Sequence, residues 1–245
     1  LKGCHIIIWT TTPWTIPANR ALAYSSKIKY SVIQIGKDTE HFQNKNIIIA
    51  SKLVKKVSED CNFQDFKVLK EFTGNEFKNT ICQHPFHNLG YNYDVPMLEG
   101  DFVILDQGTG IVHTAPRHGP DDFNLCLKHG IKAPDTMNDA GIYTNEIPFF
   151  SGMHIFKADS AIIDKLSECK SLLGNGKLQH SFPHSWRSKA PLVYRATPQW
   201  FISMEKNNLR KKALKAIDDT TFYPARGKER IRSMIETRPD WCISR

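Results

Sequence analysis

Three consecutive hydroxyl side chains follow an apolar stretch near the start of the sequence. Thr10, Thr11 and Thr12 come directly after Trp9 and before Pro13. Hydroxyls in one turn can donate and accept hydrogen bonds, so they could hold a water molecule or a sugar hydroxyl without adding charge. Threonines also suit the end of a strand and the cap of a helix. The three residues alone leave both interpretations open.

A second run of polar side chains lies between residues 108 and 123. His113, His118, Asp121 and Asp122 fall within ten residues, after glycines that permit a tight turn. A carboxylate there could anchor a substrate ammonium group, the four side chains could ligate a divalent metal, or a histidine could act as a general base. A purely structural interpretation also fits, with Asp121 capping a helix and His113 half-buried and hydrogen-bonded. The spacing does not favour a metal, because the run contains no HxxxH or HxH pair.

Aromatic and cationic residues alternate between residues 180 and 201. The run begins at His180 and includes Trp186, Arg187 and Trp200. Such alternation suits stacking on bases and contact with phosphates. It equally suits a surface connector whose aromatic rings pack inward while the cations stay solvated.

Composition narrows the class of protein. The 245 residues are 40% hydrophobic and 24% charged, which is typical of a globular chain with a real core, and the net charge of +8 favours a polyanionic partner. The six cysteines are far apart without a CxxC pair, which predicts reduced thiols rather than a zinc ribbon or a disulfide framework. The uncharged run over residues 4–18 is interrupted by prolines and threonines. Membrane, secreted mini-protein and disordered classes are therefore excluded.

Periodicity indicates strands in the first half and helices in the second. Apolar β-branched runs predict strands over residues 5–9, 28–35 and 47–49, and a strand–glycine turn–strand unit over 102–113. Helical spacing and acidic start signals predict helices from residue 121, over 158–173, around 209–217 and around 231–235. Residues 205–245 hold eleven Lys/Arg against six Asp/Glu, so they carry +5 of the net +8. The start at Leu1 and the end at Arg245 lead us to expect a segment of a longer protein.

Four strings together resemble the class I isoleucyl-tRNA synthetases, in the family's order and over most of the chain. They are Thr10–Asn19, Gly108–Phe123, Ser181–Trp200 and Arg238–Arg245. Valyl and leucyl enzymes typically have TTRP where this chain has Thr12-Pro13, and they lack an HTAP string. The resemblance implies the editing insertion of such an enzyme: an α+β fold, mainly β, with a small β-barrel and helical insertions. It implies an editing domain over residues 1–180 and a connector with a basic helical return over 181–245.

The implied activity is hydrolysis of valine that has been wrongly esterified to isoleucine tRNA. One methylene is worth only about 1–3 kcal/mol in a binding pocket, a limit for which this family is the standard example, so a second, smaller pocket must remove the error. The implied partners are the tRNA and the rest of the parent synthetase, in the cytoplasm and without a membrane. The sequence contains no HIGH-like or KMSKS-like string. ATP and Mg²⁺ are therefore expected elsewhere in the parent, and no cofactor is expected here.

The resemblance also implies roles for individual residues. Asp122 matches the carboxylate that binds the amino acid's ammonium group, and His113 matches a histidine on the pocket wall. Thr10, Thr11 and Thr12 match the cluster that lines the pocket and orients water. Asn19 and Trp14 match further residues of the substrate-binding site. No serine or cysteine matches a nucleophile, which favours attack by water assisted by the terminal ribose hydroxyl of the tRNA.

Two alternatives and two departures from the family pattern remain. The chain could be a non-catalytic tRNA-binding appendage, or a metal-dependent hydrolase using His113, His118, Asp121 and Asp122.

Arg117 stands where the family usually has glycine in HTAPGHG, so it either reshapes the loop or adds a phosphate contact. Serines stand where many members have the two cysteines of a Cys-Trp-Arg-Cys string, and thiolates bind zinc far better than hydroxyls do. We therefore predict no zinc at the two serines, Ser185 and Ser188.

Overall fold

β-Branched and aromatic residues form the sheets of this chain. The computed structural model describes residues 1–179 and 181–244, so His180 and Arg245 of the motifs above lie outside the described residues. Within them the strands are β1 (His5–Ile6), β2 (Ala21–Tyr24), β3 (Lys29–Ile35), β4 (Asn46–Ala50), β5 (Phe66–Thr73), β6 (Ile81–Gln83), β7 (Asp94–Glu99), β8 (Val112–Thr114), β9 (Phe201–Ile202) and β10 (Trp241–Cys242). The α-helices are α1 (Val54–Asp60), α2 (Pro120–Lys128), α3 (Ala158–Glu168), α4 (Leu209–Asp219) and α5 (Arg226–Glu236).

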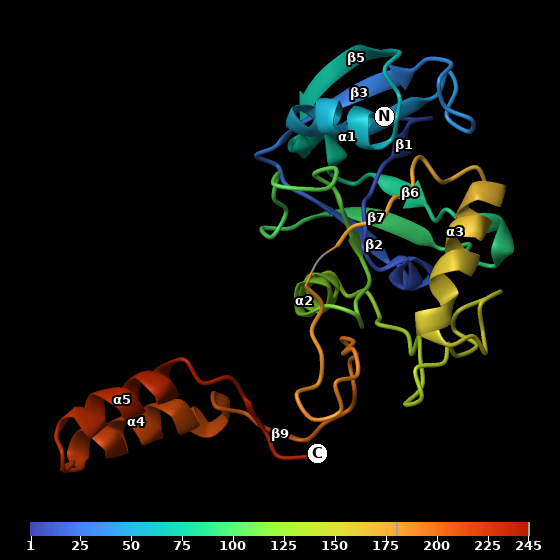
Figure 1. The fold of residues 1–245 in the computed structure, drawn as a ribbon. Helices are drawn as coiled ribbons and strands as arrows, with labels where there is room; N and C mark the ends of the chain where they lie inside the picture. Colours follow the sequence, from blue (N-terminus) through green and yellow to red (C-terminus); the bar gives the residue numbers. More distant parts are fainter. Residues whose placement is uncertain (180, 245) are drawn as a thin grey trace. The chain divides into compact units, whose positions relative to one another are not determined.

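The described residues of the first compact unit, Leu1–Arg195, form two four-stranded sheets and three α-helices, with short 3₁₀ helices between them (Figure 1). Their strand orders are β1-β4-β3-β5 and β6-β7-β2-β8. Neighbouring strands are antiparallel except in the pairs β1–β4 and β2–β7. The combination of such sheets with separate helices confirms the predicted α+β class. Among the described residues, the expected barrel takes the form of these two sheets around one core.

Buried isoleucines hold the two sheets together. Ile47, Ile48 and Ile49 of β4 are fully buried and belong to one cluster with Ile33 of β3 and Val95 of β7. Each such side chain stabilises the fold by about 1.5–3 kcal/mol through removal of apolar surface from water. A continuous apolar strand such as β4 is expected where both faces of a sheet are covered.

A second hydrophobic cluster packs against α3 and holds the segment that follows the three threonines. It joins Trp14 and Ile16 to Phe150 and Ile162 of the later chain. Trp14 belongs to the short 3₁₀ helix η1 (Pro13–Ala18), whose first free N–H, that of Trp14, donates to Asp159 Oδ1 at 2.9 Å. This contact ties η1 to the first turn of α3.

The structure corrects two local predictions. Residues 102–105 do not form a strand: the chain there runs through turns and irregular backbone, and β8, their expected hairpin partner, pairs with β2 instead. Helix α3 ends at Glu168 rather than near residue 173, because the chain turns away through Lys170 at φ +54°. The other predicted strands and helices appear, although β1 covers only two residues of the predicted 5–9.

The second compact unit, Ala196–Arg245, is a helical hairpin with a short ribbon. β9 pairs with β10 in antiparallel fashion, and α4 and α5 confirm the predicted helices. Arg210 donates to the carbonyls of Ile235, Glu236 and Arg238, which closes the C-terminal end of α5. The division at 180/181 into editing domain and connector stays a prediction. None of the helices in the described part of the chain has the length and apolar character that a membrane span requires.

Candidate active site

One cavity of about 360 Å³ brings the first two motifs together. It is lined by residues from the stretches 9–15, 104–113 and 115–122. The predicted site residues Thr10, Thr11, Thr12, His113 and Asp122 all line it. Two segments about a hundred residues apart therefore line one cavity, as the family resemblance implies.

The threonine cluster forms the polar wall of the cavity. Thr10 Oγ1 accepts a hydrogen bond from the Thr12 backbone N–H at 3.0 Å and lies 3.2 Å from Thr12 Oγ1. One of the two hydroxyls donates its proton to the other, and the second hydroxyl can donate to a molecule in the cavity. Thr11 is exposed beside them. This wall can orient a water molecule or an ester oxygen.

His113 is a neutral side chain with both ring nitrogens occupied. Asn19 Nδ2 faces the Ala21 carbonyl at 2.9 Å and His113 Nδ1 at 2.7 Å, so the amide donates to both. The single proton of the Thr15 hydroxyl goes to the Thr12 carbonyl at 2.9 Å, so His113 Nε2–H must donate to Thr15 Oγ1 at 2.9 Å. Burial, reinforced by the charge of His118, lowers the pKa of His113 to about 4. This arrangement leaves no lone pair for a general base and makes His113 a rigid wall.

Asp122 places a carboxylate at the start of a helix and at the edge of the cavity. It lies in the first turn of α2 and its Oδ2 accepts from the Ala115 N–H at 2.9 Å. Burial raises the pKa of Asp122 to about 6, against the opposing effect of the Ala115 N–H, and Asp121 raises it further. The helix N-terminus favours the anion. The carboxylate is thus mostly ionised at pH 7 and would gain from a cationic partner.

The remaining predicted residues, Trp14 and Asn19, are buried behind the cavity wall. The Trp14 ring packs edge-on against the His118 ring with centroids 4.9 Å apart. Asn19 fixes the tautomer of His113 through the contacts above. Both residues support side chains that line the cavity, and their role as substrate-binding residues stays a prediction.

Sequence reasoning missed Thr15 as a residue of the site, whereas it predicted the glycine turn at Gly108. Thr15 lines the cavity and connects His113 to the backbone of Thr12. Its position three residues after Thr12, within the same string, was the available signal. Gly108 has φ +78°, and a Cβ there would lie 3.5 Å from the Trp9 ring. The turn therefore favours glycine because of its positive φ, and not because a side chain would lack space beside Trp9.

The four residues of the metal alternative do not converge. His118 faces the Tyr194 carbonyl with Nδ1 at 3.1 Å and Thr136 Oγ1 with Nε2 at 2.9 Å, and both nitrogens of His113 are also engaged. Asp121 is exposed on α2. Over residues 1–179 and 181–244, no group of three or more His, Cys, Asp or Glu is placed to hold a metal ion. The geometry therefore gives the metal alternative no support.

The departures from the family pattern occupy ordinary turns. Arg117 NH1 lies 2.9 Å from Asp135 Oδ1, and Arg117 Nε donates to the Ala133 carbonyl at 3.1 Å. The guanidinium therefore braces the loop by contact with a neighbouring segment. Ser185 and Ser188 lie in one turn, where Ser185 Oγ accepts from the Ser188 N–H at 3.3 Å.

Comparisons with known proteins identify the family and the fold of the chain. The family model described as tRNA synthetases class I (I, L, M and V) matches residues 2–245. An isoleucine–tRNA ligase of Pelagibacter ubique is 62% identical over 245 residues, and one of Gluconobacter oxydans is 45% identical over 260 residues; each alignment covers 100% of this chain. The chain spans 27% of the length of both relatives. The crystal structure of GlLeuRS-CP1 has a TM-score of 0.56 at 14% identity, covering 73% of this chain and 87% of that one, which shows a shared fold.

Proposed function

The chain belongs to the class I tRNA synthetases of the I, L, M and V group, and from this premise we propose that it is the editing module of a longer isoleucine–tRNA ligase. Its reaction is hydrolysis of the ester that joins wrongly attached valine to the terminal adenosine of isoleucine tRNA. The observation that carries the proposal is the meeting of the threonine wall, His113 and Asp122 on one cavity. Similarity along the whole chain to isoleucine–tRNA ligases supports the choice of amino acid and tRNA.

The chemistry follows from charge and geometry at the cavity. Asp122 pairs with the α-ammonium group of the bound amino acid, which holds the ester in one orientation. The threonine hydroxyls position a water molecule, whose oxygen attacks the ester carbonyl. The bond between the carbonyl carbon and the ribose oxygen then breaks, the ribose oxygen takes a proton, and free valine leaves. The terminal ribose hydroxyl of the tRNA assists the proton transfer.

His113 supplies selectivity in this proposal. A pocket rejects a larger side chain best through a rigid obstacle, since attraction to the smaller one gives only a small ratio. Two hydrogen bonds hold the imidazole of His113 in place. Valine fits in front of this wall, whereas the extra methylene of isoleucine meets it.

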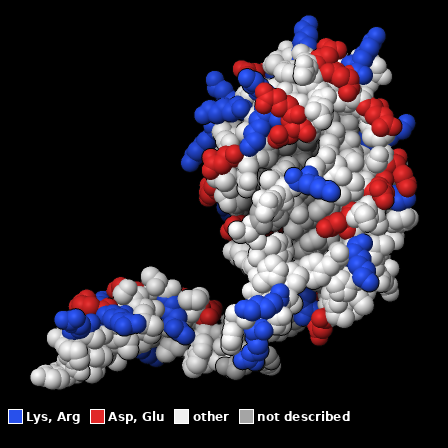
Figure 2. Space-filling model, in the orientation of Figure 1, with Lys and Arg blue, Asp and Glu red and all other residues white. Residues whose placement is uncertain are grey.

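The wider assignment rests on the same premise. We propose that tRNA and the rest of the synthetase are the partners, that ATP and Mg²⁺ act only in the aminoacylation part of the longer enzyme, and that the protein is cytoplasmic. Exposed Lys211, Lys212 and Lys215 on α4 offer phosphate contacts to the tRNA. Figure 2 shows both signs of charge on the visible face of each unit, so neither of these faces is uniformly basic. We therefore assign the phosphate contacts to the three lysines rather than to a whole face.

The test is deacylation of isoleucine tRNA charged with radiolabelled valine, with and without a metal chelator. We expect the chain, and the synthetase that contains it, to release valine at a rate that the chelator does not change. A rate equal to spontaneous hydrolysis in both proteins would refute the editing function. Loss of activity with the chelator, restored by a divalent metal, would favour the metal-dependent alternative.

A further inference from the structure

The edge of the cavity is a tight turn that carries several of its polar groups. The His118 N–H donates to the Ala115 carbonyl at 2.9 Å, which closes a turn with Pro116 and Arg117 at its centre. Ala115, His118 and Asp122 line the cavity from this turn and from the helix that follows it. The position of the turn therefore sets the shape of this side of the cavity.

The carboxylate of Asp122 depends directly on this turn. Its one hydrogen bond within the described chain comes from the Ala115 N–H, at 2.9 Å. A Cβ on Gly119 would lie 3.4 Å from the Asp122 Cγ, so the carboxyl group folds back over the backbone of the turn. A displaced turn would displace the carboxylate with it.

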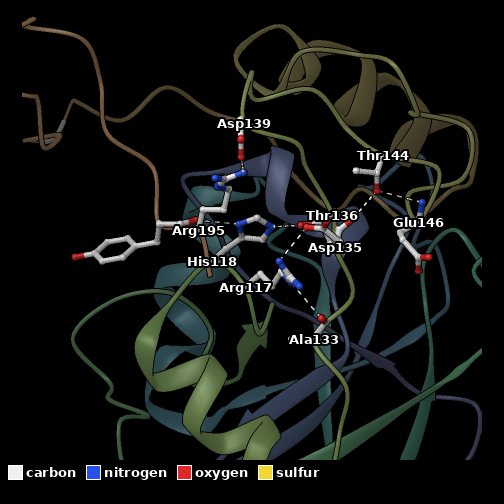
Figure 3. Close-up of polar contacts among 10 residues, drawn as sticks. Arg117, His118, Ala133, Asp135, Thr136, Asp139, Thr144, Glu146 and Arg195 are labelled. Carbon is white, nitrogen blue, oxygen red and sulfur yellow. Dashed lines mark hydrogen bonds and ion pairs between the residues drawn. The ribbon is translucent and has the colours of Figure 1, made fainter. Parts of the chain in front are cut away.

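Two consecutive residues fasten the turn to the segment 133–136 (Figure 3). Arg117 reaches the Ala133 carbonyl with Nε at 3.1 Å and Asp135 Oδ1 with NH1 at 2.9 Å. The Tyr194 carbonyl can only accept, so His118 Nδ1 carries the proton and Nε2 accepts from the Thr136 hydroxyl at 2.9 Å. The imidazole is thereby fixed in one tautomer.

The receiving segment is itself anchored. The Asp135 carbonyl accepts a hydrogen bond from the Thr144 hydroxyl, which in turn accepts from the Glu146 N–H at 3.2 Å. Asp139 beyond it pairs with Arg195 at 2.6 Å (Figure 3). An exposed ion pair alone contributes little to stability. The Arg117 side chain, however, is only 21% exposed, and its two contacts go to one anchored segment. The Arg117–Asp135 ion pair can therefore fix the position of the turn.

We propose that Arg117 is a positioning residue of the cavity, which holds the turn of residues 115–118 against the segment 133–135 and so fixes Asp122 and His118. This inference rests on the proposed editing function, and it assigns a role to the residue that stands where the family pattern has glycine. Arg117 is not among the residues with positive φ, so the turn accepts a side chain here without strain.

The activity test compares Arg117→Gly, Asp135→Ala and the double variant in the full chain. Asp122 binds the substrate before the reaction, so we expect Arg117→Gly to raise KM for valyl-tRNA about fivefold while kcat stays within about twofold. Asp135→Ala should raise KM less, because the contact of Arg117 Nε with the Ala133 carbonyl remains. The double variant should match Arg117→Gly, because loss of the arginine already removes the contact with Asp135. Arg117→Lys keeps the charge and loses the Nε contact, so its KM should lie between those of the wild type and Arg117→Gly.

The control pair is Lys165 and Glu168, whose side chains are 19% and 64% exposed, against 21% and 64% for Arg117 and Asp135. Lys165→Ala and Glu168→Ala should leave KM unchanged. Melting curves of every variant identify any that fail to fold, and Arg117→Lys replaces a variant that does.

Nitrogen NMR shifts of the His118 ring test the proposal without the reaction. We expect one tautomer, protonated at Nδ1, in the unmodified chain and a mixture in Arg117→Gly. Unchanged KM together with an unchanged ring signature, or additive effects in the double variant, would overturn the proposal. If the unmodified chain does not hydrolyse valyl-tRNA, the editing function fails while the NMR result still decides the role of Arg117.

Discussion

Replacing Asp122 by asparagine should make the protein more stable and much less active. Burial raises the pKa of Asp122 from the ordinary 3.8 to about 6, so the fold disfavours the charged carboxylate. Each pKa unit corresponds to about 1.4 kcal/mol, so the rise amounts to about 3 kcal/mol at high pH, and partial solvation through the cavity reduces this to about 2 kcal/mol. Asparagine keeps an oxygen to accept the Ala115 N–H and removes the charge.

The sign of the effect fixes its pH window. Because the pKa of Asp122 is higher in the folded state, the free energy of unfolding of the wild-type protein falls as the pH rises from about 4 through about 6. Urea unfolding of Asp122→Asn should therefore show a gain of about 2 kcal/mol at pH 8 and almost none at pH 4. Hydrolysis of valyl-tRNA should fall about 10- to 100-fold, the usual value of a charge-assisted hydrogen bond.

Asp121→Asn is the matched control, since it makes the same chemical change on the exposed neighbouring side chain. It should change stability by less than about 1 kcal/mol, the usual size of a charge effect at a helix end. An Asp122→Asn variant that is no more stable than wild type at pH 8, or that is equally stabilised at pH 4, would refute the reasoning. Full activity in that variant would remove Asp122 from the substrate site.

Three further predictions concern the pocket wall, pH and tRNA. His113→Ala should allow hydrolysis of correctly charged isoleucyl-tRNA at least about tenfold faster while valyl-tRNA is still cleaved; a parallel loss on both esters, measured by release of labelled amino acid, would identify a general base instead. Valyl-tRNA hydrolysis by the wild-type chain should fall as the pH drops below about 6, because Asp122 takes up a proton while the pKa of His113 lies at about 4; a rate that stays constant from pH 8 to pH 5 would contradict this. Replacing Lys211, Lys212 and Lys215 by glutamate should weaken tRNA binding and reduce the slope of log affinity against log salt by about 2–3, as expected for three lost phosphate contacts; an unchanged slope would show that the lysines only face solvent.

The family resemblance implied that the threonine, histidine and aspartate motifs belong to one site, but neither it nor the residue pattern predicted how the side chains are held. Thr12, His113 and Asp122 were predicted as parts of one site and line one cavity. The hydrogen bond that Asn19 donates to His113 depends on a strand pairing: Leu22 lies opposite His113, which brings Asn19 beside the ring. Periodicity within a segment carries no information on such a contact.

Local patterns failed where neighbouring strands or distant segments decided the outcome. Residues 102–105 have the composition of a strand, but β8, their expected hairpin partner, pairs with β2 instead. The partner of Arg117 lies eighteen residues away at Asp135, in a loop whose course depends on Thr144. Neither result could be read from residue type or spacing, because each depends on which surfaces the rest of the chain leaves open.

The most direct test of the account is the rate at which the chain releases amino acid from isoleucine tRNA charged with valine or with isoleucine, measured side by side with Asp122→Ala. We predict rapid release of valine, release of isoleucine at least about tenfold slower, and a background rate for the variant on both esters. Equal rates on the two esters, or an unchanged rate in a folded Asp122→Ala protein, would contradict the assignment of this cavity as the editing site.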